Sequence, residues 1–387
     1  MTFRTDEPIK VGVLFSCTGY TSVIEKTQLQ GTLLAVEEVN ASGGVNGRPI
    51  EVVYSDPKSA TREYARSAHR MIIEDDVQFF FGCYTSAARK SVIPVLEKFG
   101  GLLWYPTIYE GYEYSPNAIY SGAAPNQSNS ILADTLIDKF GSRVALIGAD
   151  YIYPRESNRT FRDHVSSRGG EIVFEEYIPL GSERHHFANL AKKLKSISPD
   201  FVFSTLVGDG IEYFYQEYYE MGFDAKVSPI ASLTTSEAEL RQMGGDVGEN
   251  HISCCSYFSS IQSTSNQSFL ESLQKRYGTG ATANMCLEAA YSQIKLFSEA
   301  AGSCDELTFE AVRSAVMYSQ VETPHGLLSI DPSNGHANLY SRLGRVLRDG
   351  TFQIIGETKT ALRPDPFLVE KDLSPQIQDN WKVVVSL

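Results

Sequence analysis

Runs of apolar residues with the length of β-strands alternate with helical patterns along the first half of the chain. Residues 9–15 (IKVGVLF) form a continuous apolar run, and residues 25–40 place Leu29, Leu33 and Val36 at helical spacing. Further strand-like runs lie at 50–54, 77–81 and 102–105, and helical patterns lie between them at 61–74 and 87–99. This alternation predicts parallel strands joined by crossover helices, and hence an open sheet covered on both faces.

The same alternation restarts after a short stretch of small residues. Residues 120–127 (YSGAAPNQ) lack periodicity and contain a proline, which is typical of a connection between domains. Beyond this stretch, strand-like runs at 144–149, 171–178 and 201–206 again alternate with helical patterns. The chain is therefore predicted to be an α/β protein with two doubly wound, Rossmann-like lobes.

The residues that directly follow the predicted strands are the candidates for ligand binding, because open α/β sheets bind ligands outside the carboxyl ends of their strands. With two such lobes, we expect a ligand cleft between them that closes by a hinge. Tyrosine and polar side chains occupy these strand ends, at Tyr84, Thr85, Ser86, Tyr105, Thr107, Tyr151, Tyr153, Asp209 and Thr234. Several tyrosines from both lobes are typical of a compact pocket, since each offers a large ring and one hydroxyl group.

Ser86 has two roles open to it, because it lies at or just before the start of the helix that follows the third strand. Its hydroxyl group can cap that helix. It can also join the backbone N–H groups of the helix start in holding an oxygen atom of a small ligand.

Composition and charge narrow the class of protein. Hydrophobic residues make up 42% and charged residues 21% of the chain, as in a well-packed globular protein, and the formal net charge is -13. That charge argues against direct binding of nucleic acid or of an anionic membrane. The six cysteines have neither CxxC nor zinc-ligand spacing, and no apolar segment of signal-peptide length precedes residue 9. We therefore expect a cytoplasmic protein with reduced thiols.

Motifs of the common enzyme classes are absent from the sequence. It contains no HExxH zinc motif, no GxSxG nucleophile motif, no phosphate-binding Walker loop and no GxGxxG dinucleotide fingerprint. The glycine-rich residues 43–47 follow a helix rather than a strand, so they are predicted to form a turn. We expect no catalytic residue, no metal site and no cofactor.

Five segments of the chain carry a resemblance to a known family. GCYTSAARK, WYPTIYEGYEYSPN, GAAPNQ, DYIYPRESN and IASLTTSEAE resemble, in this order, the AmiC-type amide receptors that regulate amidase operons, and urea-binding proteins are close to them. The resemblance extends from about residue 10 to residue 369. It implies a type I periplasmic-binding-protein fold, similar to leucine-binding protein, whose chain crosses between the lobes three times. The implied parts are 8–122 and 254–328 for the N-terminal lobe, and 123–253 and 329–387 for the C-terminal lobe.

Carried over by position, the resemblance implies ligand contacts from both lobes. The implied residues are Tyr84, Ser86, Tyr105 and Thr107 from the first lobe and Tyr151 and Tyr153 from the second, with Thr234 nearby. Asp209 and Thr85 are similar to urea-binding proteins instead, whereas Tyr84, Thr107 and Tyr153 depart from them. The balance favours short aliphatic amides and leaves urea open.

Three hypotheses of different classes follow. The leading one is a cytoplasmic sensor that binds a short amide and controls a regulator protein of the RNA-binding antiterminator type. The alternative is a receptor for urea or amides that serves an ABC transporter. The third is an amidase whose nucleophile is hidden by the fold. The sequence leaves open whether the protein forms a homo-oligomer.

Overall fold

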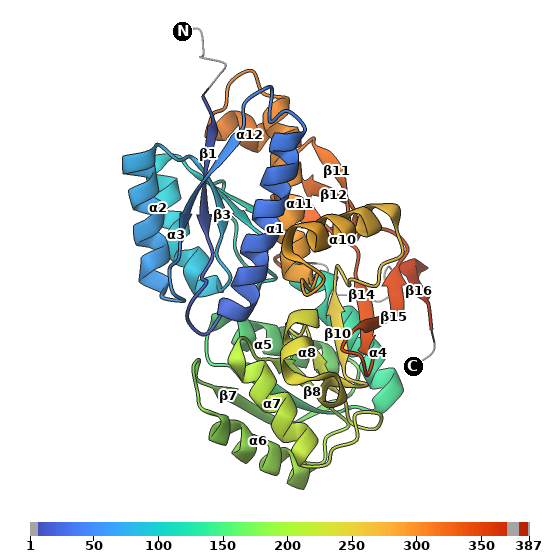
Figure 1. The fold of residues 1–387 in the computed structure, drawn as a ribbon. Helices are drawn as coiled ribbons and strands as arrows, with labels where there is room; N and C mark the ends of the chain where they lie inside the picture. The colour runs from blue at the N-terminus through green and yellow to red at the C-terminus, as the bar shows by residue number, and fades with distance from the viewer. Residues whose placement is uncertain (1–6, 370–378, 386–387) are drawn as a thin grey trace. The chain divides into compact units, whose positions relative to one another are not determined.

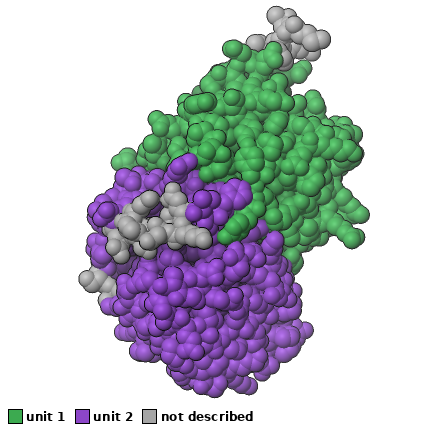
Figure 2. Space-filling view, turned by 180° about the vertical axis from the view of Figure 1, so that it is seen from behind, with its two compact units in different colours: residues 1–108, 112–123, 262–338 green, residues 109–111, 124–261, 339–387 purple. Residues whose placement is uncertain are grey.

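The computed structural model of the chain describes residues 7–369 and 379–385. The chain divides into two compact units (Figure 2). Unit 1 comprises residues 1–108, 112–123 and 262–338, and unit 2 comprises residues 109–111, 124–261 and 339–387. Within the described residues, each unit is an α/β lobe built around one mixed sheet of eight strands.

The sheet of unit 1 has the strand order β11-β12-β13-β5-β4-β3-β1-β2. Strands β1 to β5 run parallel to their neighbours, while β12 is antiparallel to both β11 and β13. The strands are β1 (Ile9–Leu14), β2 (Ile50–Ser55), β3 (Phe79–Gly82), β4 (Leu102–Tyr105), β5 (Ala118–Tyr120), β11 (Gln320–Thr323), β12 (Gly326–Asp331) and β13 (His336–Asn338). The central strands β3 and β4 are buried throughout, as expected of parallel strands with helices on both faces.

Helices of unit 1 pack in two groups, α1 against α11 and α2 against α3 (Figure 1). They are α1 (Ser22–Ala41), α2 (Thr61–Asp75), α3 (Ser86–Phe99), α10 (Thr264–Tyr277), α11 (Met285–Gly302) and α12 (Phe309–Val316). Helix α1 approaches α11 closely at Gly31, where an added Cβ atom would overlap the carbonyl oxygen of Leu287. The missing side chain therefore sets the spacing of these two helices.

The sheet of unit 2 has the order β16-β15-β14-β10-β9-β8-β6-β7 and repeats the arrangement of unit 1. Strands β6 to β10 are parallel, and β14, β15 and β16 extend the sheet in antiparallel fashion. The strands are β6 (Arg143–Ala149), β7 (Glu171–Ile178), β8 (Phe201–Thr205), β9 (Ile230–Ser232), β10 (Ile252–Cys255), β14 (Arg342–Val346), β15 (Phe352–Thr358) and β16 (Trp381–Val383). The helical segments are η1 (Pro125–Gln127), α4 (Asn129–Phe140), α5 (Ile152–Ser167), α6 (Arg184–Ile197), α7 (Asp209–Glu220), α8 (Glu237–Met243) and α9 (Gly245–Gly248).

The order of the parallel strands places a topological switch point in each unit. In unit 1, β2 lies on one side of β1 and β3 lies on the other, so successive connections leave β1 in opposite directions. In unit 2, β7 and β8 flank β6 in the same way. Ligands of open α/β sheets bind outside the carboxyl ends of the strands at such a point. The residues that follow β1, β3, β6 and β8 are therefore the candidates for ligand binding.

Two local features differ from the sequence-based expectation. The helix expected from residue 156 begins at Ile152, because Pro154 fits in the first turn of a helix, where its missing N–H group has no partner to lose. The expected part boundary between residues 253 and 254 falls inside β10, which pairs with β9 and β14 of unit 2. Hydrogen bonds across the sheet thus keep β10 in unit 2, and this part of unit 2 extends to residue 261.

Candidate functional site

The first group of candidate residues lies where β3 and β4 end in unit 1. Tyr84, Thr85 and Ser86 follow β3, Tyr105 is the last residue of β4, and Thr107 comes two residues later. All five are buried. Because β3 and β4 are parallel neighbours, their carboxyl ends bring these residues to one edge of the sheet, beside the switch point.

Thr85, rather than Ser86, caps helix α3. The Thr85 hydroxyl oxygen accepts a hydrogen bond from the backbone N–H of Ala88 at 3.2 Å. Ser86 is the first residue of the helix, and its Oγ accepts a hydrogen bond from Nη1 of Arg89 at 3.2 Å. The capping role that the sequence left open for Ser86 therefore belongs to its neighbour.

The hydroxyl groups of Tyr105 and Thr107 already have a fixed direction of hydrogen bonding. Tyr105 donates its hydroxyl hydrogen to the carbonyl oxygen of Tyr84 at 2.9 Å. Thr107 donates to the carbonyl oxygen of Cys83 at 3.4 Å and accepts from Nε2 of Gln28 at 3.1 Å. A hydroxyl group has one hydrogen and two lone pairs. Both side chains can therefore act toward a ligand only as acceptors.

A buried carboxyl group lies beside the end of β1, where the sequence analysis named no residue. Glu25, in the first turn of α1, accepts hydrogen bonds from the backbone N–H of Ser16 at 2.7 Å and from the hydroxyl groups of Thr21 and Tyr64. Burial raises the pKa of Glu25 to about 7, although these hydrogen bonds act in the opposite direction. The sequence offered one signal for this group of residues. Polar residues follow the apolar run of β1, and β1 borders the switch point.

The second group of candidates lies at the ends of β6, β8 and β9 in unit 2. Tyr151 precedes the first turn of α5 and Tyr153 lies within that turn, and the centroids of the two rings are 6.2 Å apart. Asp209 is the first residue of α7 and lies at an exposed position. Neighbouring protein atoms still remove part of the water around its carboxyl group, and this desolvation raises its pKa. Thr234 is buried and donates a hydrogen bond to the carbonyl oxygen of Leu206 at 2.7 Å, which ties the turn after β9 to the turn after β8.

Two further buried carboxyl groups follow β9 and were also missed. Glu239 accepts hydrogen bonds from the backbone N–H and the hydroxyl group of Ser236, which caps α8. Glu237 accepts from the backbone N–H of Ser259 at 2.8 Å. Burial raises the pKa of each carboxyl group to about 7. The segment SEAE reads as a helix start in the sequence, so nothing local distinguished these glutamates from exposed ones.

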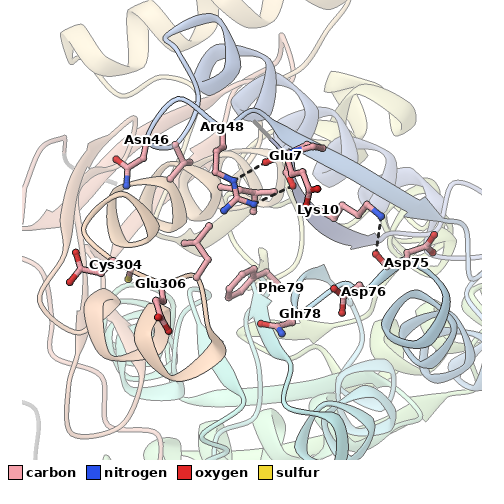
Figure 3. A pocket seen from close by; sticks show the side chains of 15 residues that line it. Glu7, Lys10, Asn46, Arg48, Asp75, Asp76, Gln78, Phe79, Cys304 and Glu306 are labelled. Carbon is pink, nitrogen blue, oxygen red and sulfur yellow. Dashed lines mark hydrogen bonds between the residues drawn. The ribbon is translucent and has the colours of Figure 1, made fainter. Parts of the chain in front are cut away.

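A cavity of about 690 Å³ lies at the opposite edge of the unit 1 sheet, at the amino ends of β1 and β3 (Figure 3). Ile9 and Phe79 line it together with charged side chains such as Lys10, Arg48 and Asp75. Lys10 donates to the carbonyl oxygen of Asp75 at 3.1 Å, and Arg48 donates to that of Glu7 at 2.7 Å. None of the residues predicted from the sequence lines this cavity, and its edge of the sheet is not the one at which such folds bind solutes.

Two negative findings concern the described residues. Within residues 7–369 and 379–385, no three His, Cys, Asp or Glu side chains gather as a metal ion would require. In the same part of the chain, no helix is both long and apolar enough to cross a bilayer.

A family model described as a periplasmic binding protein domain matches residues 9–372. The chain belongs to this family. Among its relatives, Leu/Ile/Val-binding protein homolog 6 of Brucella suis is 24% identical over 361 residues, which cover 89% of each chain. The leucine-, isoleucine-, valine-, threonine- and alanine-binding protein of Pseudomonas aeruginosa is 20% identical and covers 84% of this chain and 86% of its own.

Solved structures of periplasmic binding proteins share the fold. A solute-binding protein of an ABC transporter from Rhodopseudomonas palustris, in complex with 4-hydroxybenzoate, has a TM-score of 0.82 at 23% identity. The likeness covers 94% of this chain and all of that one. The branched-chain amino acid transporter protein LivJ of Streptococcus pneumoniae, in complex with isoleucine, has a TM-score of 0.79 at 21% identity, over 89% of this chain and 98% of its own. The predicted fold class of two α/β lobes is thereby confirmed.

Family membership also corrects one expectation. The predicted cytoplasmic location is wrong, because the family is that of periplasmic binding proteins and the similar structures are substrate-binding proteins of ABC transporters. These relatives are solute-binding proteins and not enzymes. The proteins named here are described as binding amino acids or hold 4-hydroxybenzoate or isoleucine, and none of them is described as binding an amide or a regulator.

Proposed function

We propose that this periplasmic binding protein is the solute receptor of an ABC transporter, and that its solute is a short aliphatic amide or urea. The family match over residues 9–372 carries the first part, because the similar proteins are transport receptors. It favours the transport hypothesis over the amidase-operon regulator. The direction of hydrogen bonding at the ends of β3 and β4 supports the second part.

The unit 1 residues present hydrogen-bond acceptors that suit the N–H groups of an amide. Tyr105 and Thr107 direct their hydrogens into the protein, so a solute must bring N–H groups to their oxygen atoms. The hydroxyl group of Ser86 accepts a hydrogen bond from Arg89, and in this proposal it lies beside the carbonyl oxygen of the solute. An amide has both groups on adjacent atoms, whereas a carboxylate brings no hydrogen to Tyr105 or Thr107.

We propose that the remaining candidates also take part in solute binding, each at the strand ends of its own unit. Tyr84 and Thr85 stand beside Ser86, and Tyr151 and Tyr153 would add ring surface that excludes long acyl chains. Thr234 donates its hydrogen to Leu206, so it too would act as an acceptor. Asp209 is exposed at the start of α7 and would accept an N–H group of urea or of an amide.

A branched-chain amino acid is the competing solute. The relatives named above support it, and an ammonium group could supply the hydrogens that Tyr105 and Thr107 require. The two candidates differ in one group: the amino acid needs a full carboxylate at Ser86, whereas the amide needs only a carbonyl oxygen.

Calorimetric titration separates these solutes. We expect binding of acetamide, propionamide, butyramide or urea, and at least ~10-fold weaker binding of acetate, which has the shape of acetamide but no N–H group. Binding of leucine without binding of any amide or urea would overturn the amide assignment and leave the receptor assignment intact. Absence of binding by all of these probes and by 4-hydroxybenzoate would overturn both parts.

A further inference from the structure

Four completely buried polar groups in unit 1 have no hydrogen-bond partner among the described residues. They are Oε1 of Gln28 and Oγ1 of Thr32 on α1, Nε1 of Trp104 on β4 and Nε2 of Gln293 on α11. The exposed fraction of each of these side chains is 0%. A buried polar group without a partner weakens folding, because the unfolded chain bonds the same group to water. Four such groups would together destabilise unit 1 substantially.

The four groups belong to elements that pack on one face of the unit 1 sheet. Helices α1 and α11 lie side by side (Figure 1). On α1, Gln28 and Thr32 are four residues apart and therefore neighbours on one side of the helix. The ring of Trp104 meets that of Phe297 on α11 at 83°, with centroids 5.9 Å apart, and Gln293 lies one turn from Phe297. These contacts place the four groups in the layer between the two helices and β4.

The amide groups of Gln28 and Gln293 hydrogen-bond to segments that touch each other. Nε2 of Gln28 donates to Oγ1 of Thr107 at 3.1 Å, and Oε1 of Gln293 accepts from the hydroxyl group of Ser121 at 3.2 Å. At Gly122, directly after Ser121, an added Cβ atom would lie 2.1 Å from the carbonyl oxygen of Thr107. Whichever way each amide is turned, one of its polar atoms bonds to a hydroxyl group and the other is left over.

We propose that ordered water is bound in this layer and completes the hydrogen bonding of the four groups. Gln28 Oε1 can accept a hydrogen bond, and the Thr32 hydroxyl group can accept or donate one. Trp104 Nε1 and Gln293 Nε2 can each donate one. A water molecule has two hydrogens and two lone pairs, and buried water typically makes about three hydrogen bonds to groups that are otherwise unpaired. Complete burial of all four side chains admits only so small a ligand.

This water would join three elements of unit 1 that are far apart in the chain. It would connect α1 with β4 and with α11, in a layer whose other members include the rings of Phe81 and Phe297. Through Gln28 it would also reach Thr107, beyond the end of β4. The inference does not depend on which solute the protein binds.

The indole groups of the chain allow a direct test, because the sequence has only two tryptophans. Trp104 is completely buried, whereas Trp381 in β16 is partly exposed. Trp381→Phe leaves a single indole N–H signal in the magnetic resonance spectrum and so identifies that of Trp104. In isotope-labelled protein, we expect the Trp104 N–H proton to show a rotating-frame Overhauser cross-peak to water, with the sign of close contact rather than of proton exchange. Absence of this cross-peak would overturn the proposal.

Replacement of Thr32 by valine gives a second test, in which the sign of the effect decides. Valine has the shape of threonine but lacks its hydroxyl group. If water is bound, Thr32→Val removes one of its partners, and we expect the equilibrium constant for unfolding to rise ~5-fold in chemical denaturation. If Thr32 Oγ1 has no partner, removal of an unpaired buried group should lower this constant instead. An unchanged or lower constant would overturn the proposal.

Thr205→Val provides the reference for a hydroxyl group with protein partners. Thr205 is also completely buried, and its Oγ1 lies 3.2 Å from the carbonyl oxygen of Ile147 and 2.9 Å from Oδ1 of Asn158. We expect Thr32→Val to resemble it in direction and size, although no protein group bonds to Thr32 Oγ1 within the part of the chain that the structure describes.

A crystal structure at high resolution locates the water itself. Density for water within hydrogen-bonding distance of at least three of the four groups would support the proposal, and its absence would overturn it. None of these measurements uses a solute, so failure of the proposed function would leave their outcome unaffected.

Discussion

At the ends of β3 and β4, neighbouring groups determine which way each side-chain hydroxyl group can hydrogen-bond. Tyr105 and Thr107 donate to backbone carbonyl groups, and Ser86 accepts from Arg89. A buried polar group that lacks a matching partner costs about 1–3 kcal/mol. These fixed directions therefore select among solutes of similar size by the placement of their N–H and C=O groups.

Replacement of Ser86 by alanine tests its contact with the solute. Ser86→Ala removes the hydroxyl group that we propose lies beside the solute oxygen, which would then be buried without this partner. We expect binding to weaken by about 1–3 kcal/mol, or roughly 5- to 150-fold, in calorimetric titration with acetamide. Ser91→Ala in the same helix is the control, since Ser91 bonds to the carbonyl groups of Thr61 and Ala88 and should leave affinity unchanged. Equal affinity of Ser86→Ala and the native protein would remove Ser86 from the site.

Because the carboxyl group of Glu25 is buried, we expect the free energy of unfolding to depend on pH. Its pKa is raised from 4.5 to about 7 in the folded protein, mainly by burial and further by Asp56, against the hydrogen bonds from Thr21, Tyr64 and Ser16. Between these values the folded chain retains a proton that the unfolded chain has lost. This contribution to the free energy of unfolding is complete below pH 4.5 and decreases as pH rises toward 7, by up to about 1.4 kcal/mol per pH unit.

Glu25→Gln removes this contribution while keeping the shape of the side chain. We expect the stability of the variant relative to the native protein to increase from pH 4.5 to pH 7 and to level off above it. Urea unfolding at several pH values measures the difference, in which contributions from other groups such as Glu237 and Glu239 cancel. A difference that is constant over this range would show that Glu25 is not protonated in the folded protein.

At the scale of elements, the periodicity of the sequence identified the long strands and helices, and the differences have local physical causes. The strand expected at 102–105 coincides with β4, and that expected at 171–178 coincides with β7. Strands β5 and β9 were not assigned, because three residues are too few to show a period. Their pairing with β4 and β8, which come earlier in the chain, defines them instead.

The packing of α1 against α11 gives a prediction at this scale. In Gly31→Ala, the new Cβ atom would overlap the carbonyl oxygen of Leu287, so the two helices must separate. We expect a loss of about 1–3 kcal/mol in the free energy of unfolding, measured by chemical denaturation. The loss should outweigh the gain in helix propensity of roughly 1 kcal/mol that alanine brings.

Gly302→Ala at the end of α11 is the matched control. Its new Cβ atom would have Asn46 Oδ1 as its nearest neighbour, at 3.9 Å, so only the change in propensity remains. We expect this variant to be as stable as the native protein or more so. If Gly31→Ala is equally stable, the close approach of the helices at Gly31 does not constrain the fold.

At the scale of the whole molecule, the repeated arrangement of the two units suggests how binding becomes a signal. Candidate residues lie at the switch-point edge of both sheets, Ser86 and Tyr105 in unit 1 and Tyr151 and Tyr153 in unit 2. A solute that contacts both sets favours one arrangement of the units over others, because only such a difference in affinity shifts a conformational equilibrium. A membrane transporter can then distinguish the loaded receptor from the empty one.

Small-angle scattering tests this closure directly. We expect the radius of gyration to decrease when the native protein is saturated with acetamide or urea, whichever binds in calorimetry. Tyr151→Phe keeps the ring and removes the hydroxyl group, so binding should weaken by about 0.5–1.5 kcal/mol and closure should require more solute. An unchanged radius of gyration at proven saturation would speak against a large closing motion.

The sequence by itself determined the two α/β lobes and the strand ends at which the candidate residues lie. Both depend on patterns within about ten to twenty neighbouring residues, namely apolar runs, helical spacing and turn residues, and these are local in the chain. Location was not determined in this way, because family membership corrected the cytoplasmic location expected from the sequence.

Only the tertiary structure decided the polarity of the candidate site. The acceptor role of Thr107 depends on the carbonyl group of Cys83, which is 24 residues away in the chain, and the position of Arg89 depends on Glu113, which is also 24 residues away. The burial of Glu25 depends on Tyr64, 39 residues away. The sequence does not show which partner a hydroxyl or carboxyl group will contact in the folded protein. Its donor or acceptor role and its pKa are set only when the sheet brings distant strands and helices together.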